Sequence, residues 1–170
     1  IESDTLVLSV ASSNSSLVIA SIVGTTLTLN YVANANGNTS VIVTATETNT
    51  ETALSISNTF TVTVNAVNDT PTVANAITDV TVDEDASPTT VDLSTVFSDV
   101  ESNTLSLSVE SNDTDLVTVS IEGSILTLTY VANANGNTTV VVTATETGTS
   151  PALSASNTFS VVVNAVNDAP

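Results

Sequence analysis

The chain of 170 residues has no Lys, Arg, His, Cys, Met or Trp, and its 18 acidic side chains give a formal charge of −18. Nucleic acid is excluded as a partner, because no side chain can neutralise phosphate. Disulfides, thiolate nucleophiles and His–Cys zinc sites are excluded as well. Only paired carboxylates remain for acid–base chemistry. Since such enzymes hold sugars against aromatic walls, and the chain has only three Phe and two Tyr, we expect no enzyme.

Long apolar runs are also missing. No run approaches 18 residues and no signal peptide is visible, so membrane insertion is not expected. Because the chain starts at Ile1, we expect it to be a piece of a longer polypeptide. What the chain does have is 41% hydrophobic residues in regular runs rich in Val and Thr, which suit a pleated sheet. Order is therefore expected, in spite of the acidic composition.

An internal repeat with an offset of 99 residues organises the chain. The sequence YVANANGNT at 31–39 recurs at 130–138, and residues 1–71 laid over 100–170 without a gap share 48 of 71 positions. Two domains are predicted, at 1–69 and 70–170. The first has no counterpart of residues 70–99, so we expect it to lack its opening strands and to leave a sheet edge open.

Alternation of apolar and polar residues predicts short strands throughout the second repeat. A helical turn is expected at 94–97. The expected strands are 72–74, 79–82, 89–93, 105–109, 116–121, 125–130, 139–145 and 155–163. The residues expected to face the core are Phe97, Leu105, Leu107, Val109, Leu126, Leu128, Tyr130, Phe159, Val161 and Val163. The pattern is typical of an all-β fold of tandem immunoglobulin-like Greek-key sandwiches.

Acidic loops are predicted to gather at the two ends of each sandwich, because antiparallel strands place alternate loops at opposite ends. At the entrance of the second repeat the expected group is Asn68, Asp69, Asp99, Glu101, Asn103 and Glu146. Such a set of hard oxygens suits Ca²⁺, which takes six to eight oxygen ligands. The alternative is that these loops are ordinary solvated turns.

Two further groups are expected by the same argument. At the exit of the second repeat they are Asp83, Glu84, Asp85, Asn167 and Asp168, and at the start of the first repeat Glu2, Asp4 and Glu47. Three other residues, Asn34, Asn36 and Asn38, are expected to form turns rather than to bind metal. Both tyrosines, Tyr31 and Tyr130, are expected to fill the core rather than to stack on sugars.

Several motifs together resemble a family. VNDTP at 67–71, VNDAP at 166–170, DEDASP at 83–88 and FSDVESNTLSLSV at 97–109 are similar to the cadherin-like tandem repeats (VNDAP type) of large bacterial surface proteins, including RTX-type adhesins. The resemblance implies an extracellular array of domains with calcium at the linkers. By motif it implies ligands at Asn68, Asp69, Asn167 and Asp168, at Glu84 with Asp83 and Asp85, at Asp99 and Glu101, and at Glu146 and Glu47. The loop 99–103 departs from the family pattern, with no glycine and fewer carboxylates.

The expected function is that of structural extender repeats of a secreted adhesin or surface fibre, rigidified by Ca²⁺ and mediating cell adhesion. Neighbouring repeats of the same chain are the expected partners. Two alternatives stay open: a filament subunit that self-associates by strand exchange through the open edge of the first domain, and a carbohydrate- or protein-binding module. Asn-x-Ser/Thr triplets such as 38–40 and 137–139 leave glycosylation open.

Overall fold

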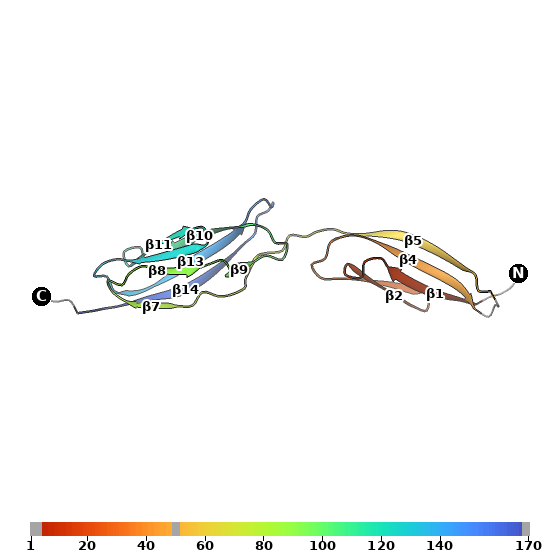
Figure 1. The fold of residues 1–170 in the computed structure, drawn as a ribbon, viewed down its shortest axis with the longest axis horizontal. Helices are drawn as coiled ribbons and strands as arrows, with labels where there is room; N and C mark the ends of the chain where they lie inside the picture. The colour runs from red at the N-terminus through yellow and green to blue at the C-terminus, as the bar shows by residue number, and fades with distance from the viewer. Residues whose placement is uncertain (1–4, 49–51, 168–170) are drawn as a thin grey trace. The chain divides into compact units, whose positions relative to one another are not determined.

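The computed structural model describes residues 5–48 and 52–167. Within these residues every regular element is a strand and none is a helix, so no helix that could span a membrane is found there. The chain forms two compact units, Ile1–Val67 and Asn68–Pro170, each drawn with its strands in Figure 1. The expected all-β fold is confirmed.

The second unit contains nine strands. They are β6 (Thr72–Val73), β7 (Val80–Asp83), β8 (Thr89–Asp92), β9 (Phe97–Ser98), β10 (Leu105–Ser111), β11 (Val117–Glu122), β12 (Ile125–Tyr130), β13 (Gly136–Glu146) and β14 (Ser154–Asn164). One sheet has the order β10-β13-β14-β7, a second has β11-β12-β8, and β6 pairs with β9. All pairs are antiparallel except β14 with β7, in which Val161 lies opposite Val80. This arrangement is an immunoglobulin-like sandwich.

The core of the second unit lies between these sheets. Seven of the predicted core residues are buried, namely Phe97, Leu126, Leu128, Tyr130, Phe159, Val161 and Val163. Leu105, Leu107 and Val109 are half-buried and pack against the same cluster. Alternation with period two therefore identifies the inward face of each strand correctly. Residues 94–96 form a single turn, as expected, with the Val96 N–H donating to Leu93 O at 3.1 Å, and Phe97 then begins β9.

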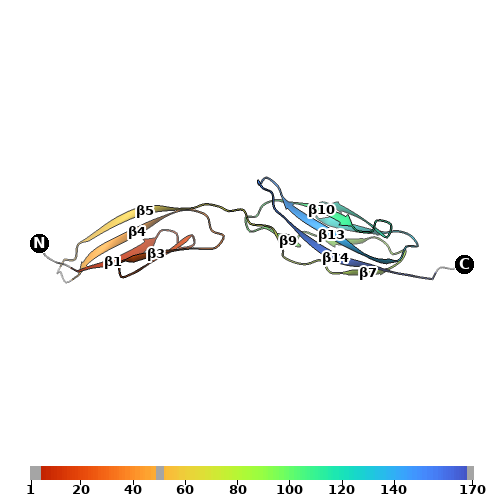
Figure 2. The same ribbon diagram turned by 180° about the vertical axis from the view of Figure 1, so that it is seen from behind.

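The described residues of the first unit, 5–48 and 52–67, contain five strands. They are β1 (Thr5–Ser12), β2 (Val18–Val23), β3 (Thr26–Tyr31), β4 (Gly37–Thr48) and β5 (Ser55–Val64). They form the sheets β1-β4-β5 and β2-β3, and Figure 2 shows β3 from the other side. Each strand corresponds by the 99-residue offset to one of β10–β14, and within residues 5–48 and 52–67 β5 pairs only with β4 and β3 only with β2.

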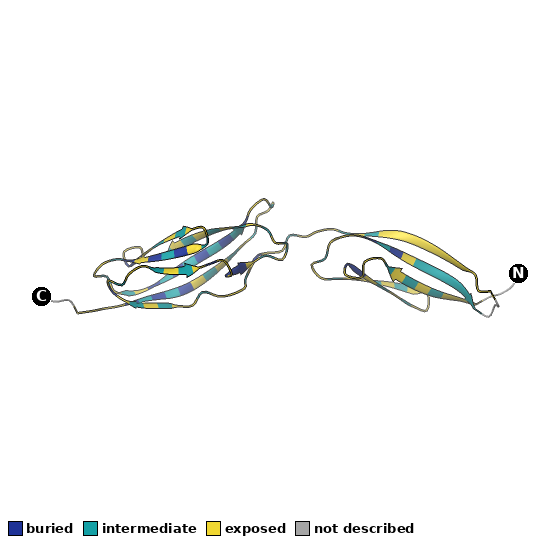
Figure 3. Ribbon diagram, in the orientation of Figure 1, coloured by how far each residue is buried: buried dark blue, intermediate teal, exposed yellow. Residues whose placement is uncertain are grey.

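Equivalent side chains of the two units differ in how far they are exposed to solvent. Phe159 in the second unit is 2% exposed, whereas its counterpart Phe60 is 38% exposed. In Figure 3, β5 is exposed along most of its length, while β14 alternates between buried and half-buried positions from Phe159 to Val163. In the described residues β5 pairs on one side only, with β4, and most of its side chains are exposed.

The two tyrosines behave differently for the same reason. Tyr130 is 8% exposed, and its hydroxyl donates to Thr89 Oγ1 on β8 at 2.7 Å, as expected of a core residue. Tyr31 is 60% exposed. The prediction that Tyr31 fills the core is wrong for the described residues, in which no strand lies beside β3 as β8 lies beside β12.

The boundary between the units lies two residues earlier than the sequence predicts. Asn68 and Asp69 belong with the second unit, since both form hydrogen bonds to its loops. The tandem repeat marks where the pattern restarts, whereas these bonds decide which unit holds the connecting residues.

Candidate functional site

The entrance end of the second unit brings together residues from three parts of the chain. Asn68 and Asp69 precede β6, Asp99, Glu101 and Asn103 lie in the loop between β9 and β10, and Glu146 ends β13. The register of the sheet explains the meeting, because Leu105 at the start of β10 lies opposite Glu146. The loop before β10 therefore reaches the same end of the sandwich as Glu146.

A chain of hydrogen bonds joins four of these residues. The side-chain amide of Asn68 donates to Glu146 Oε2 at 2.7 Å, and its carbonyl oxygen accepts from Asn103 Nδ2 at 3.0 Å. The backbone N–H of Asn103 in turn donates to Asp99 Oδ1 at 2.9 Å. Asn68 thus uses both ends of its amide and fixes the connecting segment to both loops.

Glu146 is the most deeply buried acidic residue of the cluster, with 2% of its surface exposed. Its Oε2 also accepts from Thr149 Oγ1 at 2.8 Å and from the Leu153 backbone N–H at 3.1 Å. Burial raises the pKa of Glu146, but the bonds from Asn68, Leu153 and Thr149, with a further contribution from the Asp99 side chain, outweigh it. The net effect lowers the pKa, so the carboxylate is held in its charged form.

Two carboxylate oxygens of the cluster are buried without a hydrogen-bond donor among the described residues. Asp99 Oδ2 and Glu146 Oε1 are buried, and neither has a hydrogen-bond partner in the described part of the chain. A buried carboxylate oxygen without a partner is costly. The sequence contains no cationic side chain that could pair with these oxygens, and a donor set made of oxygens alone is of the kind that Ca²⁺ takes.

The acidic residues do not all converge on this point. Across residues 5–48 and 52–167, no three acidic side chains gather as a metal centre would require. Glu101 lies to one side and accepts the backbone N–H of Asp69 through Oε2 at 3.1 Å. Of the six predicted residues, Asn68, Asn103, Asp99 and Glu146 form one network, whereas Asp69 and Glu101 form a pair beside it.

Thr149 is part of the site and was not predicted from the sequence. Its hydroxyl holds Glu146 Oε2, yet threonine is so common in this chain that its type alone carries no signal. The internal repeat contains a signal that could have identified it, because Thr50 occupies the equivalent position of the first copy while the residues on either side differ between the copies.

The exit end of the second unit is organised around Glu84, which is 8% exposed. Its Oε1 accepts the Val166 backbone N–H at 2.6 Å, and Asn135 Nδ2 lies 3.5 Å from Oε2. The two neighbouring acidic residues have other partners. Asp83 Oδ1 accepts a hydrogen bond from Asn164 Nδ2 at 3.1 Å, and Asp85 Oδ1 accepts one from the Asn133 backbone N–H at 3.1 Å. Asn167 follows Val166, and Asp168 lies outside the described residues. Glu84 thus ties the outgoing segment to the sandwich.

The third predicted group is described only in part. Glu47 is half-buried, and its Oε2 accepts the Leu54 backbone N–H at 3.2 Å, as Glu146 does from Leu153. Glu2 and Asp4 lie outside the described residues. The first unit therefore repeats one bond of the Glu146 site.

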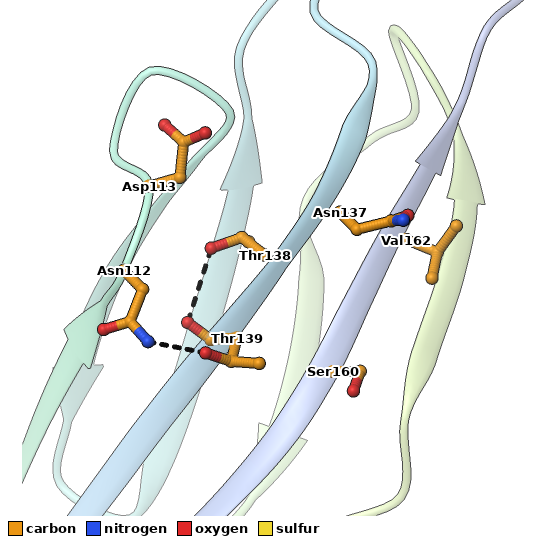
Figure 4. A pocket seen from close by; sticks show the side chains of 7 residues that line it. All are labelled: Asn112, Asp113, Asn137, Thr138, Thr139, Ser160 and Val162. Atoms are coloured by element: carbon orange, nitrogen blue, oxygen red, sulfur yellow. Dashed lines mark hydrogen bonds between the residues drawn. The ribbon is translucent and has the colours of Figure 1, made fainter.

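A shallow hollow of about 490 Å³ lies on the outer face of the β10-β13-β14 sheet. Figure 4 shows its polar lining, in which Asn112 donates to Thr139 Oγ1 at 2.6 Å. The lining residues are Asn112, Asp113, Asn137, Thr138, Thr139, Ser160 and Val162. Because this lining contains no aromatic ring, it gives no support to a sugar-stacking site.

No protein-family model and no curated protein sequence matches this chain. Solved structures do. The protocadherin γB2 extracellular cadherin domains 1–5 match with a TM-score of 0.58 at 17% identity over 95% of this chain and 34% of theirs. Protocadherin γC5 EC1-3 gives 0.56 at 18% identity over 92% of this chain and 56% of theirs, and the protocadherin γB4 extracellular domain gives 0.54 at 18%, over 92% and 27%.

These matches show the fold. At 17–18% identity they establish that the chain has a cadherin-like architecture, as the resemblance in sequence motifs implied. The chain spans between about a quarter and just over a half of the length of these structures.

Proposed function

We propose that the chain is a pair of cadherin-like extender repeats of an extracellular adhesin or surface fibre, of the bacterial type that its motifs resemble, and that Ca²⁺ bound at the Asn68–Asp99–Glu146 cluster stiffens the connection into the second unit. The observation that carries the calcium part is the pair of buried oxygens without partners, Asp99 Oδ2 and Glu146 Oε1. The cadherin-like fold supports the extracellular, adhesive setting.

The residues of the cluster have separate roles in this proposal. Asp99 and Glu146 supply the two oxygens that have no other partner, and Asp69 and Glu101 add carboxylates beside them. Asn103 holds Asp99 through its backbone N–H, and Asn68 holds Glu146 through its side-chain amide. When bound, Ca²⁺ supplies positive charge that offsets the repulsion among these carboxylates.

The mechanical consequence follows from where Asn68 lies. It is the first residue of the second unit, directly after Val67, so immobilising Asn68 and Asp69 shortens the connection that is free to move. Glu84 serves the outgoing segment in the same way through Val166. The partners of this function are neighbouring repeats of the same polypeptide, and the place is the cell surface or the surrounding medium.

Calcium titration of the full chain tests the proposal. We expect Ca²⁺ to bind by isothermal titration calorimetry and to raise the melting temperature of the second unit relative to EDTA, with Mg²⁺ weaker because it demands a stricter geometry. Asp99→Asn with Glu146→Gln should weaken binding. Glu110→Gln, which removes a charge from an exposed position on β10, is the matched control and should bind as the parent chain does.

Two results would contradict the calcium part. One is that calcium and EDTA samples melt alike at millimolar Ca²⁺. The other is that the Asp99→Asn, Glu146→Gln chain binds calcium as tightly as the Glu110→Gln chain, which would place the ion elsewhere.

A further inference from the structure

The chain contains five Asn-x-Ser/Thr triplets, the motif at which N-linked sugars are attached in secreted proteins. They begin at Asn14, Asn38, Asn68, Asn112 and Asn137. In a chain rich in Asn, Ser and Thr such triplets also arise by chance. The surroundings of each asparagine therefore decide which of them can carry a sugar.

One of these triplets is present in both copies of the repeat. Asn38 and Asn137 are equivalent by the 99-residue offset, and the last residue of the triplet is Ser40 in one copy and Thr139 in the other. The copies thus differ here only by an exchange between the two residue types that the motif accepts. The other three triplets have no counterpart at positions 113–115, 13–15 and 167–169.

Three of the five asparagines use their side-chain amides to hold the fold. Asn68 donates to Glu146 Oε2 at 2.7 Å, so a sugar on Asn68 Nδ2 would compete with that bond in a part-buried place. Asn112 donates from Nδ2 to Thr139 Oγ1 at 2.6 Å. The side-chain oxygen of Asn14 accepts the backbone N–H two residues further on at 3.0 Å.

Asn38 and Asn137 are engaged in no such bond. Both are exposed, and neither side-chain amide has a hydrogen-bond partner in the described part of the chain. Strand alternation places Asn137 on the outer face of β13, because its neighbours Thr138 and Val140 are on the buried face. A substituent on Asn137 Nδ2 therefore displaces no bond of the fold.

The shallow hollow on the outer face of the β10-β13-β14 sheet lies beside Asn137 (Figure 4). Its volume of about 490 Å³ is within the range of small-ligand sites. The hydroxyls of Thr139 and Ser160 and the carboxylate of Asp113 line it, and each can bond to a sugar hydroxyl. The lining has no aromatic ring on which a free sugar could stack, whereas a sugar attached to Asn137 is held there at high effective concentration.

From these observations we propose that Asn137, and Asn38 in the first unit, are acceptor sites for an N-linked hexose or N-acetylhexosamine, and that the sugar on Asn137 lies over the hollow. In the transfer, Nδ2 forms a bond to C1 of the sugar. The bond from C1 to a diphosphate oxygen breaks, and the diphosphate leaves with the electron pair. The proton released from Nδ2 goes to a base of the transferring enzyme.

This inference does not depend on calcium. Asn137 and Glu146 lie near opposite ends of β13, about 30 Å apart at the rise of an extended strand. A sugar on Asn137 therefore leaves the calcium cluster untouched, and either proposal can fail without the other.

Two preparations of the full chain test the two carriers of a sugar diphosphate. One chain is secreted from yeast, which transfers sugar from a lipid diphosphate, and the other is folded first and then treated with a soluble N-glycosyltransferase and UDP-glucose. Because the chain has no Lys or Arg, it is cut with a glutamate-specific protease rather than trypsin. The peptides 123–146, 111–122 and 52–84 then contain one triplet each, and 3–47 contains two that fragmentation separates. Mass spectrometry gives the occupancy of each asparagine.

We expect sugar on Asn137 and Asn38, and about tenfold less on Asn68, since modification there costs a hydrogen bond to a carboxylate. Thr139→Val should abolish the modification of Asn137 and Thr139→Ser should retain it. Ser160→Ala, which lines the hollow outside the triplet, is the matched control and should leave the occupancy unchanged. Occupation in one preparation alone identifies the carrier.

Two results overturn the assignment. One is an Asn137 or an Asn38 without sugar in both preparations, and the other is equal occupancy of Asn68 and Asn137. Nuclear Overhauser contacts between the sugar and the Val162 methyl groups should place the sugar over the hollow. Their absence would show that the sugar projects into solvent, which overturns that part of the proposal.

Discussion

The side-chain amide of Asn68 donates a hydrogen bond of 2.7 Å to Oε2 of Glu146, which lies 78 residues further along the chain. This bond joins the first residue of the second unit to the end of a central strand. It makes Asn68 a structural part of the sandwich rather than a passive connecting residue.

Asn68→Ala is expected to destabilise the second unit. The change removes a donor from Glu146 and an acceptor from Asn103, leaving polar groups with fewer partners in a part-buried place. We expect its melting temperature to fall by roughly 5 °C, as measured by circular dichroism. Asn65→Ala, an exposed position three residues earlier, is the control, and an equal effect of both changes would argue against a specific role of Asn68.

The stability of the second unit should depend on pH through Glu146. Its pKa lies below the ordinary value of 4.5, so the folded state holds the charged form more readily than the unfolded state does. The resulting stability is present above about pH 4.5 and is lost as the pH falls through the folded pKa.

Urea unfolding between about pH 5 and pH 3 checks this dependence. The free energy of unfolding should fall less steeply in Glu146→Gln than in the parent chain. Part of the pH dependence of the free energy of unfolding should remain in Glu146→Gln, because the Ser94 backbone N–H also lowers the pKa of Asp92. Parallel slopes in the two chains would show that Glu146 does not contribute.

Truncating the equivalent phenylalanines should give unequal effects. Phe159→Ala removes a fully covered ring and should cost about 3–5 kcal/mol. Phe60→Ala removes a ring that is 38% exposed and should cost less, about 1–2 kcal/mol. Urea unfolding followed by amide exchange on β14 and β5 separates the two units, and equal losses would mean that the first unit has a covered core in solution.

Glu84→Ala should release the outgoing segment. The change removes the carboxylate oxygen that accepts the Val166 N–H, so exchange at this amide should accelerate at least tenfold, whereas exchange in β13 should not change. Asp115→Ala, in an exposed loop, serves as the control. Unchanged exchange at Val166 would show that other contacts hold the segment.

Much of the fold could be predicted because strands alternate with period two and the repeat supplies a second, independent copy of each pattern. The inward placement of Phe159, Val161 and Val163 follows from that alternation. Strand direction alone was enough to bring Asn68, Asp99 and Glu146 to one end.

The remaining features depend on tertiary contacts that no local pattern records. Residue type does not distinguish Glu146 from Glu101, but Glu146 lies in phase with the buried Val142 and Ala144 of β13, whereas Glu101 lies in a loop and accepts a backbone N–H. The exposure of Tyr31 was mispredicted because its type and spacing match Tyr130, whereas among the described residues only Tyr130 has a strand, β8, beside its own.

The contrast between these two rings also has an experimental use. The chain has two tyrosines and no tryptophan, so its tyrosine signal in the near ultraviolet comes from one ring in each unit. Tyr31 faces solvent and Tyr130 is enclosed with its hydroxyl bonded to Thr89. Nitration or iodination should therefore mark Tyr31 first, and the chain carries, without any added label, one tyrosine reporter in each unit.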